Sequence, residues 1–420
     1  MICRHCHAEL SLTLVDLGAA PPSNAYLTRL TMRRPEKWFP LRVLVCESCW
    51  LVQAESYSRA AELFNEEYAY FSSFSELWLK HAQHYVSMVI DRFGLTVDSH
   101  VVEVASNDGY LLQYMKQRGI PCLGIEPTAS TSAAARMKGI ETIEDFFGVK
   151  LAKVLADQGR QADLMVANNV LAHVPNIGNF TAAFATLLKP QGLVTFEFPY
   201  VMKLIEHNAF DTIYHEHFSY LSLATVMRIF NRNGLAIFDV EELPTHGGSL
   251  RLFAQRKDTG VYPMSSNVTN LLNKETAAKI NQSSYYQGFQ ENVDKVKNDF
   301  MAFLLKAKQE GKTVVGYGAA AKGNTLLNYA GVRPDLLPFV VDRNPAKQGK
   351  YLPGSRIPIF DESRLRDAQP DYVVILPWNL KEEVMRQLDY INAWGGKFVT
   401  AIPVLKCGYN EEIIVNTSIA

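Results

Sequence analysis

Four of the six cysteines stand in two close pairs, Cys3 with Cys6 and Cys46 with Cys49. Each pair has the two-residue spacing of a metal-binding knuckle, and four thiolates form the ligand set of a tetrahedral Zn2+ site. We therefore predict one zinc ion held by these cysteines. Its role is expected to be structural, because a closed four-sulfur site leaves no coordination position for a substrate.

A second candidate site begins in VVEVASNDGYLLQYM, which reads as a strand, a turn of small residues and a helix. Small residues let the backbone pass close to a ligand at the end of a strand. One β-unit later, GIEP places a carboxylate where it can accept hydrogen bonds from two ribose hydroxyls. The alternative is a generic α/β turn with a solvated carboxylate. The candidate cofactor-binding residues of this region are Glu103, Ala105, Asn107, Asp108, Gly109, Glu126 and Pro127.

Two further predicted strand ends carry polar or aromatic side chains. Asp145 and Phe146 can hold an adenine by a hydrogen bond and by stacking, and Asn168 and Asn169 follow the next strand. A dinucleotide site would place phosphate-binding glycines in the turn after the first strand. The turn in EVASNDG lacks such a glycine pattern. The pattern therefore favours a methyltransferase-type site.

The segment YHEHFSY crowds Tyr214, His215, Glu216 and His217 into four consecutive positions. A histidine with glutamate and tyrosine neighbours can be oriented and its pKa tuned, as a general base requires. A metal at the two histidines is the alternative, but the sequence offers no third ligand nearby.

Two glycine-containing turns could bind anions. HGGSLR combines glycines with His246, Ser249 and Arg251 as possible donors, or it is a plain tight turn. In VVGYGAAAKGNTLLNY, a glycine turn leads into a helix with Lys322 at its start, and FVVDRN follows. This second pattern fits a nicotinamide-binding turn or a site for the pyrophosphate of a nucleotide sugar, and the sequence alone does not separate the two.

The elements that must position these residues alternate between β-rich and helical segments, which predicts an α/β fold. We expect an N-terminal zinc-binding module, a central Rossmann-like methyltransferase domain and a C-terminal Rossmann-like α/β domain. The predicted bounds are 1–65 for the module, 66–265 for the methyltransferase domain, 266–310 for linking helices and 311–420 for the C-terminal domain.

The composition limits the kinds of partner that we expect the protein to bind. The 420 residues carry 42 basic and 43 acidic side chains, so nothing favours nucleic acid or an anionic membrane surface. No stretch reaches the roughly 18 apolar residues of a membrane span, and MICRHCHAEL has no apolar signal region. We expect a cytoplasmic protein, as a monomer or weak dimer.

These motifs, in this order, resemble the sugar C-methyltransferases that act at C3 of nucleotide-linked 4-keto-deoxysugars. The resemblance runs over nearly the whole chain. It rests on the cysteine pairs and on EYAYFSSFS, EVASNDG, NNVLAHVPN, YHEHFSY, HGGSLR, GYGAAAKGNTLLN and ILPWN.

The resemblance implies S-adenosylmethionine and structural zinc as cofactors, and a dTDP- or GDP-linked 4-keto-6-deoxysugar as substrate. A base would form an enolate that accepts the methyl group at C3, in the biosynthesis of a branched-chain deoxysugar. The implied catalytic residues are His217 as the base, with Glu216, Tyr214, Tyr70 and His173. The implied substrate-binding residues are Phe71, Ser72, Ser73, Tyr200, His246, Gly247, Ser249, Arg251, Tyr317, Lys322, Asn324, Asp342, Trp378 and Asn379. The alternatives are a nicotinamide-dependent nucleotide-sugar oxidoreductase, an O-methyltransferase and a non-catalytic binding subunit organised by zinc.

Overall fold

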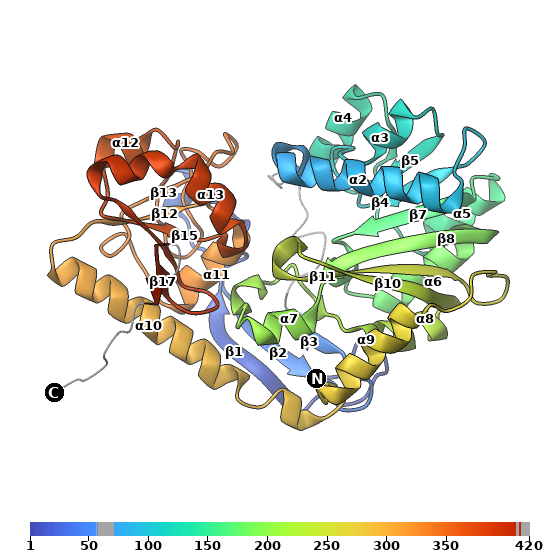
Figure 1. The fold of residues 1–420 in the computed structure, drawn as a ribbon, viewed down its shortest axis with the longest axis horizontal. Helices are drawn as coiled ribbons and strands as arrows, with labels where there is room; N and C mark the ends of the chain where they lie inside the picture. The colour runs from blue at the N-terminus through green and yellow to red at the C-terminus, as the bar shows by residue number, and fades with distance from the viewer. Residues whose placement is uncertain (56, 58–70, 409–410, 413–420) are drawn as a thin grey trace. The chain divides into compact units, whose positions relative to one another are not determined.

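The computed structural model describes the chain except for residues 56, 58–70, 409–410 and 413–420 (Figure 1). The chain forms two compact units, and each contains segments that are distant in sequence. Unit 1 consists of Met1–Leu12, Val45–Val201 and Phe218–Tyr285, and unit 2 consists of Thr13–Leu44, Met202–His217 and Tyr286–Ala420. Residues predicted to form a single N-terminal module therefore belong to both units.

Unit 1 is built on a seven-stranded sheet with the order β10-β11-β8-β7-β4-β5-β6. Its strands are β4 (Val101–Val104), β5 (Cys122–Ile125), β6 (Glu141–Ile143), β7 (Ala162–Asn168), β8 (Leu188–Pro199), β10 (Leu235–Leu243) and β11 (Ser249–Arg256). β11 is antiparallel to both of its neighbours, and the other pairings are parallel. The strand order reverses between β4 and β7. In open α/β sheets, this reversal point marks where ligands bind, beyond the carboxyl ends of the strands.

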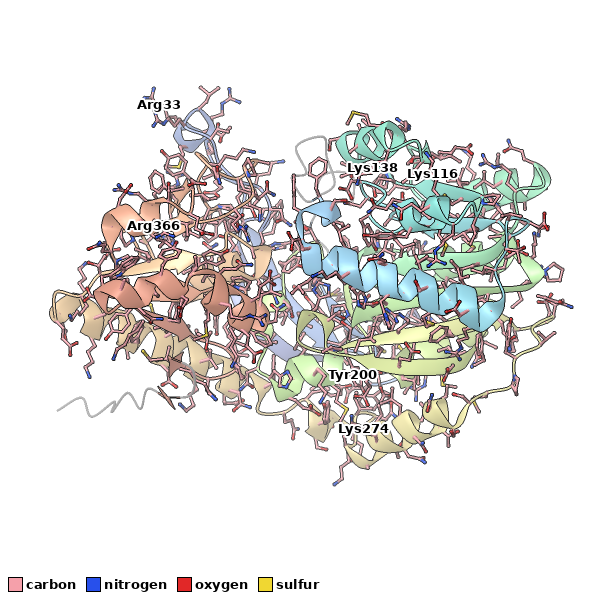
Figure 2. The ribbon with its side chains drawn as sticks, turned by 45° about the horizontal axis from the view of Figure 1, so that its top comes forward. Arg33, Lys116, Lys138, Tyr200, Lys274 and Arg366 are labelled. Atoms are coloured by element: carbon pink, nitrogen blue, oxygen red, sulfur yellow. The ribbon has the colours of Figure 1, made fainter. Side chains whose placement is uncertain are left out.

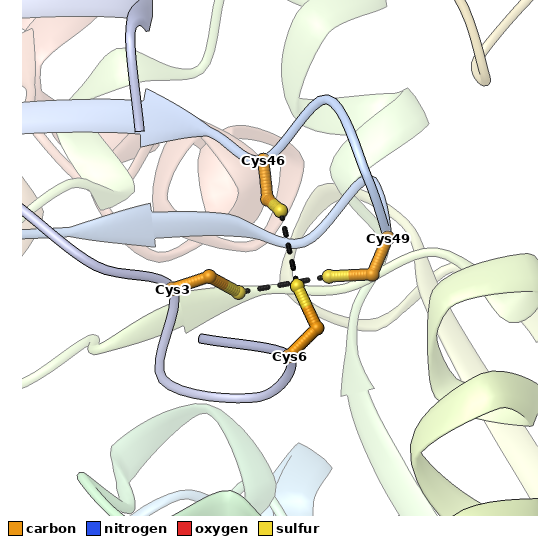
Figure 3. Close-up of side chains that lie close together, drawn as sticks. All are labelled: Cys3, Cys6, Cys46 and Cys49. Atoms are coloured by element: carbon orange, nitrogen blue, oxygen red, sulfur yellow. Dashed lines mark hydrogen bonds between the residues drawn. The ribbon is translucent and has the colours of Figure 1, made fainter. Parts of the chain in front are cut away.

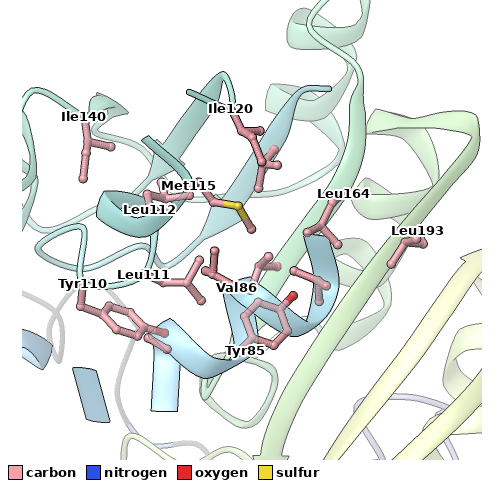
Figure 4. Close-up of a cluster of buried hydrophobic side chains, with 14 of the residues drawn as sticks. Tyr85, Val86, Tyr110, Leu111, Leu112, Met115, Ile120, Ile140, Leu164 and Leu193 are labelled. Atoms are coloured by element: carbon pink, nitrogen blue, oxygen red, sulfur yellow. The ribbon is translucent and has the colours of Figure 1, made fainter. Parts of the chain in front are cut away.

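Helices cover the sheet of unit 1 on both faces because the side chains of each strand alternate. On β8, Thr195 bonds to Tyr85 of α2, whereas the next residue, Phe196, packs against Phe184 of α6 and Phe230 of α8. Figure 4 shows the first face, where Tyr85 and Val86 meet Leu164 and Leu193. The helices are α2 (Glu76–Phe93), α3 (Leu112–Gln117), α4 (Ala129–Met137), α5 (Val149–Asp157), α6 (Ile177–Leu187), α8 (Leu223–Arg232) and α9 (Ser266–Ala277).

Shorter elements complete unit 1. They are the paired strands β3 (Val52–Ala54) and β9 (Ser219–Tyr220), and the 3-10 turns η2 (Ser72–Phe74), η3 (Leu171–His173), η5 (Thr245–Gly247) and η6 (Ser283–Tyr285). The long helix α2 precedes β4 in the chain. Ser75 caps its start by accepting a hydrogen bond from the backbone of Trp78, and Gly94 ends it with a left-handed φ of 63°.

Unit 2 contains a second seven-stranded sheet, with the order β14-β13-β12-β15-β16-β17-β18. Its strands are β12 (Val314–Tyr317), β13 (Val340–Val341), β14 (Ile359–Phe360), β15 (Tyr372–Ile375), β16 (Lys397–Thr400), β17 (Lys406–Cys407) and β18 (Glu411–Glu412). The pairings from β14 to β16 are parallel, and β17 and β18 add an antiparallel edge. The order again reverses beside β12.

The remaining elements of unit 2 come from three parts of the chain. They are β1 (Leu12–Ala20), η1 (Thr31–Arg33), β2 (Phe39–Val45), α7 (Val201–Glu206), η4 (Phe210–Thr212), α10 (Phe289–Gln309), α11 (Ala321–Tyr329), α12 (Arg364–Ala368), η7 (Trp378–Leu380), α13 (Lys381–Gln387) and η8 (Asp389–Trp394). The predicted α/β class is confirmed, with a four-cysteine site near the N-terminus, a central Rossmann-like sheet and a largely parallel C-terminal sheet. Among the described residues, no helix is both long and apolar enough to cross a membrane.

A buried carboxylate ties α9 to the start of α8 in unit 1. Glu275 is 0% exposed and accepts hydrogen bonds from the Tyr200 hydroxyl at 2.9 Å and from the backbone N–H groups of Leu223 and Ala224 at 2.7 and 2.8 Å. The first N–H groups of a helix have no partner inside the helix, so this carboxylate satisfies two of them. Tyr200 was predicted to bind substrate, and the structure places its hydroxyl in this buried contact.

Replacing Glu275 with alanine should destabilise unit 1 by about 2–4 kcal/mol, because three donors would lose their acceptor in the interior. The neighbouring Lys274 makes a surface ion pair with Glu242 and serves as the control (Figure 2). Lys274→Ala should change stability by no more than about 0.5 kcal/mol. Denaturant titration monitored by tryptophan fluorescence measures both variants. Equal midpoints for Glu275→Ala and the parent chain would contradict this role.

Candidate functional site

The four predicted zinc ligands lie together in unit 1. The Sγ atoms of Cys3, Cys6, Cys46 and Cys49 are all within 4.8 Å of one another, and they form the only such group of possible metal ligands in the described part of the chain. Cys3 lies 3.6 Å from Cys49, and Cys6 lies 3.4 Å from Cys46 (Figure 3). Four sulfurs at about 2.3 Å from a tetrahedral ion are about 3.8 Å apart, so these positions fit Zn2+.

The backbone explains why the sulfurs converge. In each knuckle, the carbonyl of the first cysteine accepts a hydrogen bond from the N–H four residues later, from His7 to Cys3 at 3.0 Å and from Trp50 to Cys46 at 2.7 Å. His7 and Trp50 both have a left-handed φ, of 64° and 62°, which closes each turn. The contact between the two thiols lowers the pKa of Cys3 and raises that of Cys49, so the two sulfurs titrate as one pair.

A second group of functional side chains surrounds the reversal point of the unit 1 sheet. After β4, Ala105, Asn107 and Gly109 have φ values of 58°, 50° and 75°, so the turn is left-handed at three of five positions. Such conformations are costly for residues other than glycine and concentrate at functional sites. At Gly109 a side chain would also collide with Ile140, because an added Cβ would lie 2.4 Å from its Cδ1.

Several buried oxygens at this strand end have no hydrogen-bond partner among the described residues. They are both carboxyl oxygens of Glu103, Ser106 Oγ, Asp108 Oδ1 and Asn168 Oδ1. Burial raises the pKa of Glu103 well above its usual range. Buried polar atoms normally have partners, so these oxygens indicate a polar ligand that carries donors or positive charge. S-adenosylmethionine, with its ammonium, sulfonium and hydroxyl groups, fits this set.

Glu126 stands at the end of β5, as predicted. Its Oε2 accepts a hydrogen bond from the backbone of Asn107 at 3.0 Å, and its Oε1 accepts one from Thr128 at 2.9 Å. These two bonds fix the carboxylate and join it to the turn after β4. Each carboxylate oxygen can accept a further hydrogen bond, so two hydroxyls of one ribose remain compatible with this arrangement. Burial raises the pKa of Glu126, an effect opposed by the Thr128 and Asn107 N–H groups.

The other predicted cofactor residues also follow strands of this sheet. Asp145 and Phe146 come after β6, and the Phe146 ring is 49% exposed, whereas Phe147 packs against Phe184 inside unit 1. Asn169, after β7, has a φ of 52° and bonds through Nδ2 to His246 at 3.2 Å. Phe146 is therefore the ring at this strand end that can still stack on a base.

Residues predicted to bind substrate divide between the two units. Unit 1 contains Phe71, Ser72, Ser73, Tyr200, His246, Gly247, Ser249 and Arg251, together with the predicted catalytic residue His173. Unit 2 contains Tyr317, Lys322, Asn324, Asp342, Trp378 and Asn379. The backbone N–H groups of Ser72 and Ser73 bond to Asn107 and Asp108 at 2.9 and 3.3 Å, which places them beside the turn after β4. Tyr70 lies outside the described residues.

Arg251 is enclosed in an ionic cluster that the sequence did not indicate. Its guanidinium donates to Glu197 at 2.9 Å and to Glu241 at 3.2 Å, and it lies over the ring of Tyr85. His81 also bonds to Glu197, at 2.8 Å. Burial raises the pKa of Glu197, but His81 and Arg251 outweigh it, so the pKa is lowered. A phosphate would have to compete with both carboxylates for Arg251. Glu197 itself could have indicated this cluster, because an acidic residue in a buried strand needs a charged or hydrogen-bonding partner.

The predicted base cluster belongs to unit 2. Residues 214–217 form a tight turn closed by a 2.9 Å hydrogen bond from the His217 N–H to the Tyr214 carbonyl, so the segment is not extended. The Tyr214 and His217 rings are in tilted contact, with centroids 4.0 Å apart and an angle of 33° between their planes. His217 Nδ1 lies 2.7 Å from the Thr212 carbonyl, and this contact orients the ring.

The two neighbours of His217 in this turn have other partners. Both oxygens of Glu216 accept hydrogen bonds from the Asn24 amide, at 2.9 and 2.7 Å. Burial raises the pKa of Glu216 to about 7, although the Asn24 amide opposes the shift. His215 Nε2 lies 3.3 and 3.2 Å from the carbonyls of Phe39 and Pro40, and burial lowers the pKa of His215.

A cationic and polar group occupies the carboxyl end of the unit 2 sheet. Lys322, in the first turn of α11, donates to Asn379 at 2.7 Å and lies over the Trp378 ring. Burial lowers the pKa of Lys322, although the nearby charge of Asp211 acts to raise it. Asp211 accepts a 2.9 Å hydrogen bond from the Trp378 indole. Asn324 is 1% exposed, and neither of its side-chain polar atoms has a partner among the described residues. These side chains could hold a polar anion.

The carboxylate of Asp342, which follows β13, interacts with residues of unit 2. Its Oδ2 accepts from the Ala319 N–H at 2.7 Å, its Oδ1 accepts from Asn344 at 2.8 Å, and Lys347 lies 3.5 Å away. A nicotinamide dinucleotide would need this carboxylate for its ribose. Tyr317 is buried in β12, with its hydroxyl 3.4 Å from Gln387.

Purified protein should contain about one zinc ion per chain, because the four sulfurs have tetrahedral spacing. Cys46→Ser should lose most of this zinc, whereas Cys122→Ser, which changes a cysteine of β5 outside the cluster, should retain it. Elemental analysis by plasma mass spectrometry provides the measurement. Zinc-free parent protein with an intact fold would rule out the site.

Glu126→Ala should weaken binding of S-adenosylmethionine by about 1.5–3 kcal/mol, the worth of charge-assisted hydrogen bonds. Glu141→Ala removes a carboxylate from the neighbouring strand β6 that pairs with Arg160, so it is the matched control. Isothermal calorimetry should find near-parental affinity for the control. If Glu126→Ala also binds normally, the ribose lies elsewhere.

Three family models match the chain in sequence order: a zinc binding domain over residues 3–64, a methyltransferase domain over 78–240 and a C-methyltransferase C-terminal domain over 244–403. The chain is 34% identical over 403 residues to the C-methyltransferase NovU of Streptomyces niveus, and the match covers 96% of this chain and 95% of NovU.

Other relatives match only part of the chain. The ubiquinone biosynthesis O-methyltransferase of Chelativorans sp. (strain BNC1) is 28% identical over 95 residues, which are 22% of this chain and 38% of that protein. Magnesium protoporphyrin IX methyltransferase of Synechocystis PCC 6803, solved with bound SAM, is 17% identical over 43% of this chain and 79% of that chain, with a TM-score of 0.33. That likeness is too slight to bear on function. The full-length similarity to NovU and the three matched domains show that the chain belongs to the C-methyltransferase family, as a zinc-binding, S-adenosylmethionine-dependent enzyme.

Proposed function

We propose that this C-methyltransferase transfers its methyl group to C3 of a nucleotide-linked 4-keto-6-deoxysugar, with dTDP or GDP as the nucleotide. The observation that carries the proposal is the buried turn of residues 214–217, which brings an oriented imidazole next to a carboxyl group whose pKa is about 7. A base that works near neutrality is what abstraction of a proton beside a ketone requires.

The chemistry follows from the acidity of the substrate. The 4-keto group acidifies the hydrogen at C3, so a base can remove that proton and leave an enolate. S-adenosylmethionine, when bound, supplies an electrophilic methyl group. The C3 carbon forms its new bond to that methyl, the carbon–sulfur bond breaks, and S-adenosylhomocysteine leaves. His217 holds the abstracted proton until it passes to solvent.

The hydrogen bonds of the two histidines support His217 as the base. Its Nδ1 donates to the Thr212 carbonyl, so Nε2 is the basic nitrogen of the neutral ring. His215 instead donates from Nε2 to the carbonyls of Phe39 and Pro40 in β2, and burial lowers its pKa. In this proposal His215 anchors the turn, and Tyr214 and Glu216 relay protons.

Polar groups in each unit support the assignment of ligands. In unit 1, the unpartnered oxygens of Glu103 and Asn168 and the fixed carboxylate of Glu126 would hold S-adenosylmethionine, with Phe146 against the adenine. In unit 2, Lys322, Asn324 and Asn379 would hold the sugar diphosphate. His173 and Tyr70 are proposed, by resemblance alone, to stabilise charge on the oxygen at C4.

His217→Asn should slow the wash-in of deuterium at the sugar C3, in the absence of S-adenosylmethionine, by at least roughly a hundredfold, the usual contribution of a general base. His215→Asn, two residues away, is the matched control and should exchange within a few-fold of the parent rate. Proton NMR in D2O follows the exchange. Normal exchange by His217→Asn together with loss in His215→Asn would assign the base to His215.

A further inference from the structure

Glu216 is a carboxyl group in an unusual position, because it is only 2% exposed and makes no ion pair among the described residues. Burial favours the protonated form of a carboxyl group. A proton relay near neutral pH needs this group to be ionised for part of the time. Some group must therefore offset the cost of burying the charge.

The offsetting group comes from a segment 192 residues earlier in the chain. The Asn24 amide nitrogen lies 2.9 Å from Oε1 and 2.7 Å from Oε2 of Glu216, so one NH2 group donates to both oxygens. Hydrogen bonds to a charged acceptor are stronger than those to a neutral one, so these contacts favour the carboxylate.

The segment that carries Asn24 is itself fixed within unit 2. The Tyr26 hydroxyl donates to the Ala319 carbonyl at 2.6 Å, at the end of β12, and Leu27 pairs with Tyr351 through backbone bonds of 2.9 and 2.8 Å. The same hydroxyl lies 3.5 Å from Asn24 Oδ1, on the side of the amide away from Glu216. The amide nitrogen is thus held toward the carboxylate.

We propose that Asn24 is a positioning residue that holds the Glu216 carboxylate in its ionised, proton-accepting state during C3 deprotonation. This inference rests on the function proposed above, in which Glu216 relays protons. Nothing in the local sequence PPSNAYL indicated such a role.

The balance of effects on Glu216 gives the direction of the test. Burial raises the pKa of Glu216 to about 7, and the amide of Asn24 opposes that rise. The other titratable groups near the turn are Tyr214, His215 and His217 on its own segment and Tyr26 beside Asn24, with Lys347 and Asp342 reached through Tyr26. Removing the amide should therefore raise the pKa of Glu216 further, so that the carboxylate is lost at a higher pH.

Two isosteric variants test the proposal. Asn24→Leu removes the donors while keeping water out, and Asn24→Asp adds a like charge. Both variants should raise the pKa of Glu216 by about one to two pH units. The pH at which the rate of deuterium exchange at C3 falls on the acidic side should rise by the same amount. Ser23→Ala alters the neighbouring buried hydroxyl, which lies 3.4 Å from Thr325, and should leave both quantities in place.

The pKa of Glu216 is measured directly by NMR titration of protein labelled with 13C at the glutamate carboxyl, with Glu216→Gln identifying the signal. A purely structural role of Asn24 would reduce the exchange rate equally at all pH values without moving the limb. An unchanged carboxyl pKa in both Asn24 variants would overturn the proposal. If the carboxyl pKa rises while the exchange limb stays, Asn24 does control Glu216, and the relay role in the proposed function is wrong.

Discussion

Ionising a carboxyl group inside a protein costs several kcal/mol unless donors replace the lost water. That constraint governs the arrangement of unit 2 around Glu216. Asn24 supplies the donors, Tyr26 and Leu27 fix its segment at the edge of the sheet, and the turn of residues 214–217 presents Glu216 to it. A segment that precedes the unit 1 sheet in the chain and a segment that lies between β8 and β10 thus come together within unit 2. The proposed base cluster therefore depends on contacts between parts of the chain that are far apart in sequence.

Unit 1 meets a complementary constraint at the ends of β4 and β7. There the structure leaves buried oxygens of Glu103, Ser106, Asp108 and Asn168 without partners among the described residues. Such atoms are unfavourable in the unliganded protein and favourable once a ligand with donors and positive charge is bound. The left-handed turn after β4 and the fixed carboxylate of Glu126 hold these atoms in place. The two units therefore differ: unit 2 satisfies the Glu216 carboxyl group internally, whereas unit 1 leaves buried polar atoms without partners among the described residues, and we propose that these atoms bind the cofactor.

The sequence predicted features that depend on local spacing. The cysteine pairs converge because each knuckle closes on itself, and the polar residues after β4, β5 and β6 share one sheet edge because parallel strands must end together. It did not predict contacts over long separations, such as that of Asn24 with Glu216 or of His81 and Arg251 with Glu197. The adjacency of Glu216 and His217 likewise did not indicate the contact between His217 Nδ1 and the Thr212 carbonyl, which the tight turn creates.

The central claim is that the methyl group is transferred to the carbon beside the ketone of a nucleotide-linked keto-sugar. It is tested most directly by incubating the purified enzyme with S-adenosylmethionine and a panel of nucleotide-linked 4-keto-6-deoxysugars, followed by mass spectrometry and carbon NMR of the product. The account predicts the gain of one methyl group, bonded to C3, for at least one dTDP- or GDP-linked sugar. A methyl group bonded to oxygen, or no transfer to any sugar in the panel, would contradict it.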